Sequence, residues 1–160
     1  MDGLIAAGQD GTTLWGIGGA WTHWDFVKLE FQEATGTNYK RLVYDGGATV
    51  MTDIMSGDCT VATPFVSEAL TAIDAGEAVP IAITSAERND ACPDIPTVAE
   101  LGYEGFDSTM WRGFVAPVGT DEAAMREFAE AVGTVCENPE FQDAATKAVS
   151  YTHLTLPTKR

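Results

Sequence analysis

Short apolar or β-branched runs alternate along the first half of the chain with segments whose apolar residues recur at helical spacing. The runs lie at residues 13–15, 41–44, 60–63 and 81–84. Such runs are typical of strands, and the segments between them are typical of amphipathic helices. The alternation predicts βαβ units, an α/β fold and a mostly parallel sheet.

Each of the helical segments has an apolar face and is followed by a glycine. The first segment covers about residues 21–34, with Trp24, Val27 and Phe31 on one face. Glycine readily adopts the left-handed conformation found at helix C-termini, so Gly36, Gly57 and Gly76 predict where the helices end. The predicted apolar faces of the second and third helices are Ala48, Met51, Thr52 and Met55, and Val66, Ala69, Leu70 and Ile73.

The pattern changes after the fourth run. A polar, proline-containing loop leads to Thr97 and Glu100, whose spacing is that of a capping box opening a single helical turn. Residues 111–116 are predicted to form a strand, and a long helix and a further helix starting at Asn138-Pro139 follow. These helices need another surface to cover the apolar face of the long one, which comprises Met125, Phe128, Ala129, Val132, Val135 and Cys136.

The candidate site consists of three turns, each joining a predicted strand to a predicted helix. They cover residues 14–24, 44–48 and 63–67, and they contain no basic residue. Ligands of open α/β sheets bind at the carboxyl ends of the strands, where these turns lie. An anion would therefore be held by main-chain N–H groups at helix N-termini. The candidate ligand-binding residues are Gly18, Gly19, Ala20, Thr22, His23, Asp45, Gly46, Gly47, Ala48, Thr63, Pro64 and Phe65.

For several residues of these turns, a structural role is the alternative to a role in ligand binding. His23 either contacts the ligand or caps and packs its own helix. Trp21 and Trp24 either wall the pocket or, for at least one of them, belong to the core. Asp45 is interpreted as a turn residue, because its charge would repel a bound anion.

Charge narrows the classes of partner. The chain has 160 residues, with 9 Lys and Arg against 24 Asp and Glu, a net charge of -15 and a pI near 4.2. This balance opposes binding to nucleic acid or to an anionic membrane. No apolar run approaches the roughly 18 residues of a spanning helix, and the first residues lack the pattern of a signal peptide. Arg88 and Arg112 could clamp an anion, but their positions favour a role in tying connections together.

Neither metal binding nor catalysis is indicated. Cys59, Cys92 and Cys136 lack metal-ligand spacing, and either one disulfide or free thiols fit their number, so no metal and no cofactor are expected. Trp21 stands where a dinucleotide fingerprint has its third glycine. The sequence also lacks a G-x-S-x-G nucleophile elbow, and an enzyme is therefore not expected.

Five motifs spread along the chain carry a family resemblance. They are Gly16-x-Gly18-x-x-x-x-His23, Tyr44-Asp45-Gly46-Gly47, Ile83-Thr84-Ser85-x-x-Arg88, Pro93-Asp94-Ile95-Pro96-Thr97-x-x-Glu100-x-Gly102 and Trp111-Arg112-Gly113-x-x-Ala116-Pro117-x-Gly119-Thr120. In order and spacing they resemble the periplasmic solute receptors of tripartite tricarboxylate transporters, also called Bug proteins, and the resemblance covers residues 13–147.

The resemblance implies a periplasmic-binding-protein-like lobe of a two-lobed receptor. Such a receptor closes on a small carboxylate and presents it to a membrane permease. The carboxylate would be held by main-chain N–H groups, small hydroxyls and water. The family has a small hydroxyl residue in the first turn. In this chain Thr22 is the only residue of that turn with a side-chain hydroxyl, so the identity of the carboxylate stays open.

The resemblance also implies a division of the chain. Residues 1–108 would be the second, ligand-binding lobe, and residues 109–148 a crossover strand and helices of the first lobe, most of which would precede Met1. Residues 149–160 resemble a translated sequencing adapter and are expected to be a non-native tail. A non-catalytic α/β interaction module without a small-molecule ligand is the alternative function.

Overall fold

Two compact units make up the chain, and each is described by itself. They are Met1–Met110 and Trp111–Arg160. The computed structural model describes residues 1–148, so the predicted tail at residues 149–160 lies outside the described residues. Among the described residues, no helix is both long and apolar enough to cross a membrane.

The first unit contains a three-stranded parallel sheet, as the alternating pattern predicted. Its strands are β1 (Leu14–Ile17), β2 (Lys40–Val43) and β3 (Val61–Ala62), in the order β2-β1-β3. β1 pairs in parallel with both neighbours, with Leu14 opposite Lys40 and Trp15 opposite Val61. The prediction of an α/β fold with a mostly parallel sheet is confirmed.

The predicted fourth strand at residues 81–84 is wrong. Only Ile83 pairs in β fashion, in an isolated parallel bridge with Thr97. The N–H of Ile83 donates to the carbonyl of Pro96 at 2.8 Å, and its carbonyl accepts from Val98 at 2.9 Å. This segment thus pairs with the loop that carries the capping box and does not extend the sheet.

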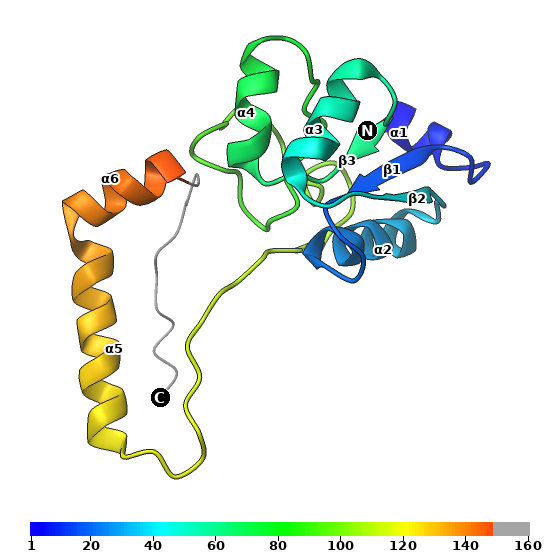
Figure 1. Ribbon diagram of the computed structural model, residues 1–160. Coiled ribbons are helices and arrows are strands. Elements are labelled where there is room, and N and C mark those ends of the chain that lie inside the picture. Colours follow the sequence, from blue (N-terminus) through cyan, green and yellow to red (C-terminus); the bar gives the residue numbers. More distant parts are fainter. Residues whose placement is uncertain (149–160) are drawn as a thin grey trace. The chain divides into compact units, whose positions relative to one another are not determined.

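Helices cover both faces of the sheet. α2 (His23–Thr35) lies on one face, and α3 (Gly47–Ser56) and α4 (Val66–Asp74) lie on the other (Figure 1). Gly36 and Gly57 end α2 and α3 with φ values of 65° and 83°, which confirms these predicted stops. Gly76 has a φ of 73° but follows the C-cap residue of α4, Ala75. A short helix that the sequence analysis missed, α1 (Asp2–Ala7), precedes the sheet.

An aromatic cluster forms the core between α2 and the sheet. The Trp15 ring lies 5.4 Å from the Phe31 ring and 4.8 Å from the Tyr39 ring, centroid to centroid. Trp24 is buried, so of the two tryptophans in the first turn this one belongs to the core. The hydroxyl of Tyr39 donates to the carbonyl of Leu4 at 2.6 Å, which ties α1 to the same cluster.

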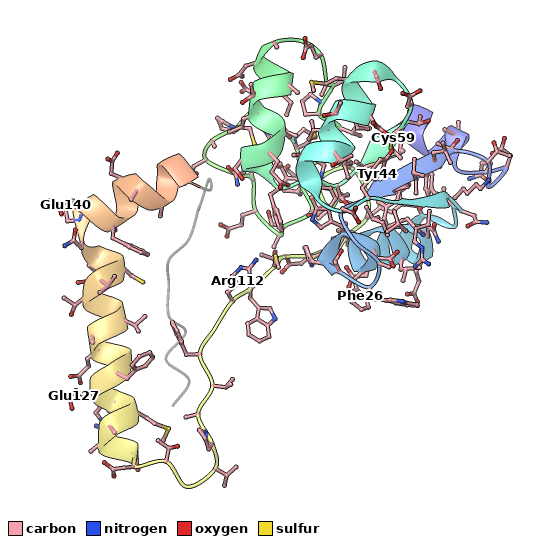
Figure 2. All side chains as sticks on the ribbon, viewed as in Figure 1. Phe26, Tyr44, Cys59, Arg112, Glu127 and Glu140 are labelled. Carbon is pink, nitrogen blue, oxygen red and sulfur yellow. The ribbon has the colours of Figure 1, made fainter. Side chains whose placement is uncertain are left out.

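On the opposite face, the predicted apolar side of α3 is right for Met51 and wrong for its other three residues. The buried residues are Val50 and Met51, whereas Ala48, Thr52 and Met55 are exposed. α3 packs on the middle strand, where a Cβ on Gly16 would lie 3.0 Å from Val50 and 2.8 Å from the Cys59 sulfur. The glycine in the strand therefore selects which helix residues approach it. Figure 2 shows Tyr44 and Cys59 within this crowded interior.

The predicted apolar face of α4 is only half-buried. Val66, Ala69, Leu70 and Ile73 are all intermediate in exposure, and Ala72 is the buried residue of this helix.

The capping box at residues 97–100 is formed as predicted, although the turn is not a regular helix. The N–H of Thr97 donates to Glu100 Oε2 at 2.7 Å, and the N–H of Glu100 donates to Thr97 Oγ1 at 3.1 Å. Arg88 donates to the Glu100 carboxylate at 2.9 Å and to the carbonyl of Pro93 at 2.9 Å. Arg88 therefore ties this loop together.

The second unit contains α5 (Glu122–Glu137) and α6 (Pro139–Ala148). The side chain of Asn138 accepts from the N–H of Glu140 at 2.8 Å, which confirms the predicted start of α6 at Asn138-Pro139. The predicted strand at residues 111–116 is wrong, because these residues are exposed and in no regular element. A β-type sequence forms a strand only beside a partner strand, and the described residues place none there.

Candidate functional site

The structure brings the three predicted turns together at the carboxyl ends of the strands. A Cβ on Gly18 would lie 3.4 Å from both the Gly46 carbonyl carbon and the Gly47 nitrogen, so the first two turns are in contact. The rings of Trp24 and Phe65 lie edge to face with centroids 5.9 Å apart, which joins the first turn to the third.

The first turn presents main-chain donors. Gly19 has a φ of 122°, a conformation that favours glycine. The hydroxyl of Thr22, the N-cap residue of α2, donates to the Gly19 carbonyl at 2.8 Å and does not cap the helix. Helix geometry leaves the N–H groups of His23 and Trp24 without an acceptor within α2. These donors and the positive end of the helix dipole make the turn suitable for an anion.

The third turn already binds a carboxylate of the protein itself, and this carboxylate also lies close to the second turn. Glu68 Oε2 accepts from the N–H of Phe65 at 3.0 Å. The same carboxylate lies against Gly47, where a Cβ would be 2.6 Å from Glu68 Cδ. The sequence analysis missed Glu68, although its position three residues into α4 is typical of a capping carboxylate. The N–H of Phe65 is therefore already occupied, whereas the first N–H groups of α2 and of α3 have no acceptor within their own helices.

The remaining candidate residues lie around this junction. Asp45 and Ala48 are exposed on the second turn, and Ala20 is exposed on the first. The hydroxyl of Thr63 is buried and has no hydrogen-bond partner among the described residues. Pro64 is half-buried beside it. Thr63 is thus a candidate residue whose buried hydroxyl lacks a partner in the described part of the chain.

The histidine of the first turn contributes little positive charge. Burial lowers the pKa of His23 below its ordinary value, and the nearby Glu30 carboxylate only partly opposes this effect. The imidazole is therefore neutral at pH 7. It can exchange a hydrogen bond with a ligand but does not act as a cation.

A cation from outside the three turns borders the first one, and the sequence analysis missed it. Arg41, in β2, donates through Nη1 to Asp25 Oδ2 at 2.8 Å, and its guanidinium carbon lies 5.5 Å from the centre of the Trp21 ring. Trp21 itself has a φ of 59°, is 71% exposed and donates its N–H to the same Asp25 oxygen at 3.2 Å. Asp25 and Arg41 are 16 positions apart in the sequence. Arg41 comes near the first turn because β2 pairs in parallel with β1, the strand that leads into this turn.

Among residues 1–148, no group of histidine, cysteine and acidic side chains is arranged to hold a metal ion. Cys59, Cys92 and Cys136 are free thiols. Burial raises the pKa of the Cys59 and Cys92 thiols, which are consequently protonated at neutral pH.

A parallel α/β lobe with helix-starting turns at its strand ends is the architecture of periplasmic binding proteins, and solved structures match this fold. A protein titled R. palustris Rpa4515 with adipate has a TM-score of 0.76 at 21% identity, over 92% of this chain and 50% of that one. MatC from Rhodopseudomonas palustris with bound malate has a TM-score of 0.68 at 20% identity, over 91% and 48%.

The sequence defines the family. Residues 1–150 match the profile described as tripartite tricarboxylate transporter family receptor, and the chain belongs to this family. It is 30% identical over 128 residues to a UPF0065 protein in the TAR-I ttuE-ttuC' intergenic region of Agrobacterium vitis, which covers 80% of this chain and 37% of that protein. It is 33% identical over 91 residues to protein BugT of Bordetella pertussis, over 57% and 28%. The chain thus spans about half or less of the proteins it matches.

Proposed function

We propose that this chain is part of an extracytoplasmic receptor that binds a small carboxylate and delivers it to the permease subunits of a tripartite tricarboxylate-type transporter. The family match over residues 1–150 carries the proposal. The proposed receptor works in the periplasm, needs no cofactor, catalyses no reaction and binds no nucleic acid. Two of the structural neighbours are described with adipate and with bound malate, and both of these ligands are small dicarboxylates.

The proposed carboxylate site is residues 18–23 of the first turn, with the second and third turns beside it. Its main-chain donors and helix dipole suit a carboxylate, and in the neighbouring third turn the Glu68 carboxylate already occupies the N–H of Phe65. No side chain of the three turns is a cation, so the binding energy would come mainly from main-chain hydrogen bonds.

Residues 109–148 are proposed to belong to the other lobe of the receptor. Trp111, Phe114 and Val115 are exposed, and so is much of the apolar face of α5, including Met125 and Phe128. Such a series of apolar side chains needs a covering surface. The matched structures are about twice as long as this chain, and a receptor of that length would include a second lobe with such a covering surface.

The proposal is tested by following main-chain amide signals of the 160-residue chain by NMR during titration with adipate and with malate at pH 7. We expect the amides of Gly18, Gly19 and His23 to shift in a saturable manner, with an affinity in the millimolar range, because one lobe supplies only part of a closed site. Hexane-1,6-diol, which matches the chain length of adipate without its charges, is the control.

The outcomes separate the two candidate functions. Saturable shifts in the first turn with the acids but not with the diol support the receptor. No saturable response to any small carboxylate would favour the alternative, a non-catalytic interaction module. Micromolar affinity of this chain alone would contradict the view that a second lobe completes the site.

A further inference from the structure

A buried carboxylate lies directly behind the proposed anion site. Asp25 is 1% exposed, and its Oδ2 accepts both the N–H of Trp21 at 3.2 Å and Arg41 Nη1 at 2.8 Å. The oxygen is therefore in hydrogen-bond contact with the turn proposed to receive a second carboxylate. Like charges at such short range repel each other strongly unless a cation balances them.

The structure supplies positive charge near Asp25 from β2 and from α2 itself. Arg41 comes from β2, and its side chain is 40% exposed above the Trp21 ring. Lys28, one helical turn beyond Asp25, is 4% exposed and donates to Gln32 Oε1 at 2.9 Å. Burial lowers the pKa of Lys28, with the Asp25 charge opposing this and the Arg41 charge adding to it, so the three groups act on one another electrostatically.

We infer that Asp25 and Arg41 are positioning residues for carboxylate binding: Asp25 fixes the left-handed Trp21 in the first turn, and Arg41 cancels the charge that this arrangement buries. The inference rests on the proposed function of the turn. Neither side chain needs to touch the ligand. Their effect reaches it through the conformation of the turn and through the electrostatic potential at its N–H groups.

A charge-balancing role makes a prediction that a merely structural role does not. Removing Arg41 alone leaves the buried Asp25 without its ion-pair partner, whereas removing both charges restores the original net charge. Arg41→Gln should therefore weaken adipate binding by about fivefold, and the double variant with Asp25→Asn should recover it to within about twofold. A structural role would make the double variant at least as weak as Arg41→Gln.

The experiment measures the dissociation constant of adipate from the amide shifts of the first turn in the original protein, Arg41→Gln, Asp25→Asn and the double variant. Asp25→Asn keeps a side-chain oxygen for the Trp21 N–H and removes the charge, so this variant should bind at least as tightly as the original protein. Arg88→Gln is the matched control, because Arg88 also pairs with a carboxylate, that of Glu100 at 2.9 Å, but outside the three turns.

Positioning is read without ligand, from the hydrogen exchange of the Trp21 amide. It should exchange faster in Asp25→Ala than in Asp25→Asn, because alanine offers no acceptor. If Arg41→Gln does not fold, Arg41→Lys replaces it: because lysine keeps the charge but loses the planar guanidinium over the Trp21 ring, charge balancing predicts binding within about twofold of the original protein, and a merely structural role predicts a larger loss.

The outcomes separate the proposed carboxylate-binding function from the positioning role of Asp25 and Arg41. An original protein that responds to no carboxylate overturns the proposed function and this role with it. An original protein that binds adipate, together with an Arg41→Gln variant that binds it equally well or a double variant that binds it no better than Arg41→Gln, overturns this inference alone.

Discussion

The two units of the chain bury their apolar residues to very different extents. In Met1–Met110, aromatic rings fill the space between sheet and helices, and Phe31 is 3% exposed. In the second unit, Phe128 is 51% exposed and its ring meets that of Phe114 edge to face, at 5.1 Å between centroids. Figure 2 shows Glu127 on the same open helix. Amphipathic pattern alone therefore gives a helix, and a core requires a partner surface.

The largest expected effect comes from truncating one phenylalanine in each unit. Phe31→Ala removes a ring packed against Trp15 and should lower the free energy of unfolding by about 3–5 kcal/mol. Phe128→Ala should cost less than about 1 kcal/mol, because its ring is already half in water. Urea denaturation followed by circular dichroism measures both, and equal costs would show that the second unit has a core of its own.

The next prediction places ligand binding in the first unit. Gly18→Pro removes a main-chain N–H and stiffens the first turn, so it should weaken carboxylate binding by about tenfold or more. Arg88→Gln in the first unit and Arg112→Gln in the second should change the affinity much less. NMR titration with adipate checks the order. A harmless Gly18→Pro beside an arginine change that abolishes binding would place the site elsewhere.

A smaller effect on thermal stability should distinguish the Arg88–Glu100 ion pair, within a folded loop of the first unit, from the Arg126–Glu122 ion pair on the exposed surface of α5. Hydrogen bonds from Arg88 and from the N–H of Thr97 hold the pKa of Glu100 below its ordinary value. The stability that Glu100 contributes is thus fully present above that ordinary value, about 4.5, and is lost as the pH falls through the lowered one.

Glu100→Gln should therefore lower the Tm measurably at pH 7 and flatten its decline in acid. Glu122→Gln removes the partner of Arg126 on α5, a pair with both side chains well exposed, and should leave the Tm unchanged. Thermal melts followed by circular dichroism between pH 3 and pH 7 test both variants; a larger loss for Glu122→Gln would reverse the contrast between the units.

The smallest effect is expected for the end of the chain. Deleting residues 149–160, which resemble a translated adapter and lie outside the described residues, should leave the Tm and carboxylate binding within experimental error. A loss of several degrees in the melting experiment would mean that this segment packs on the protein.

Sequence reasoning succeeded where a local signal decides the structure. Gly36 and Gly57 end their helices in the left-handed conformation, Thr97 and Glu100 cap each other, and Asn138 begins a helix. In each of these cases the residues that determine the structure are neighbours in sequence. The meeting of the three turns also followed from one general rule about parallel sheets.

Sequence reasoning failed where a distant partner decides. Residues 111–116 have β-type composition but no neighbouring strand among the described residues, and Ile83 pairs with a loop. The face of α3 was misjudged because Gly16 of β1 selects Val50 as its contact. Arg41 was missed as a neighbour of the first turn because the register of β2 against β1 had to be known first.

The order of pairing in the sheet has a consequence for how the protein forms during synthesis. β1 is the central strand, yet Leu14 pairs with Lys40 and Trp15 pairs with Val61, so β1 leaves the ribosome before either neighbour exists. Contacts of such separation form slowly, whereas α5 and α6 are joined by local contacts. The apolar β1 segment is therefore exposed to chaperones and to off-pathway association until β3 emerges, and the first turn takes shape only after that point.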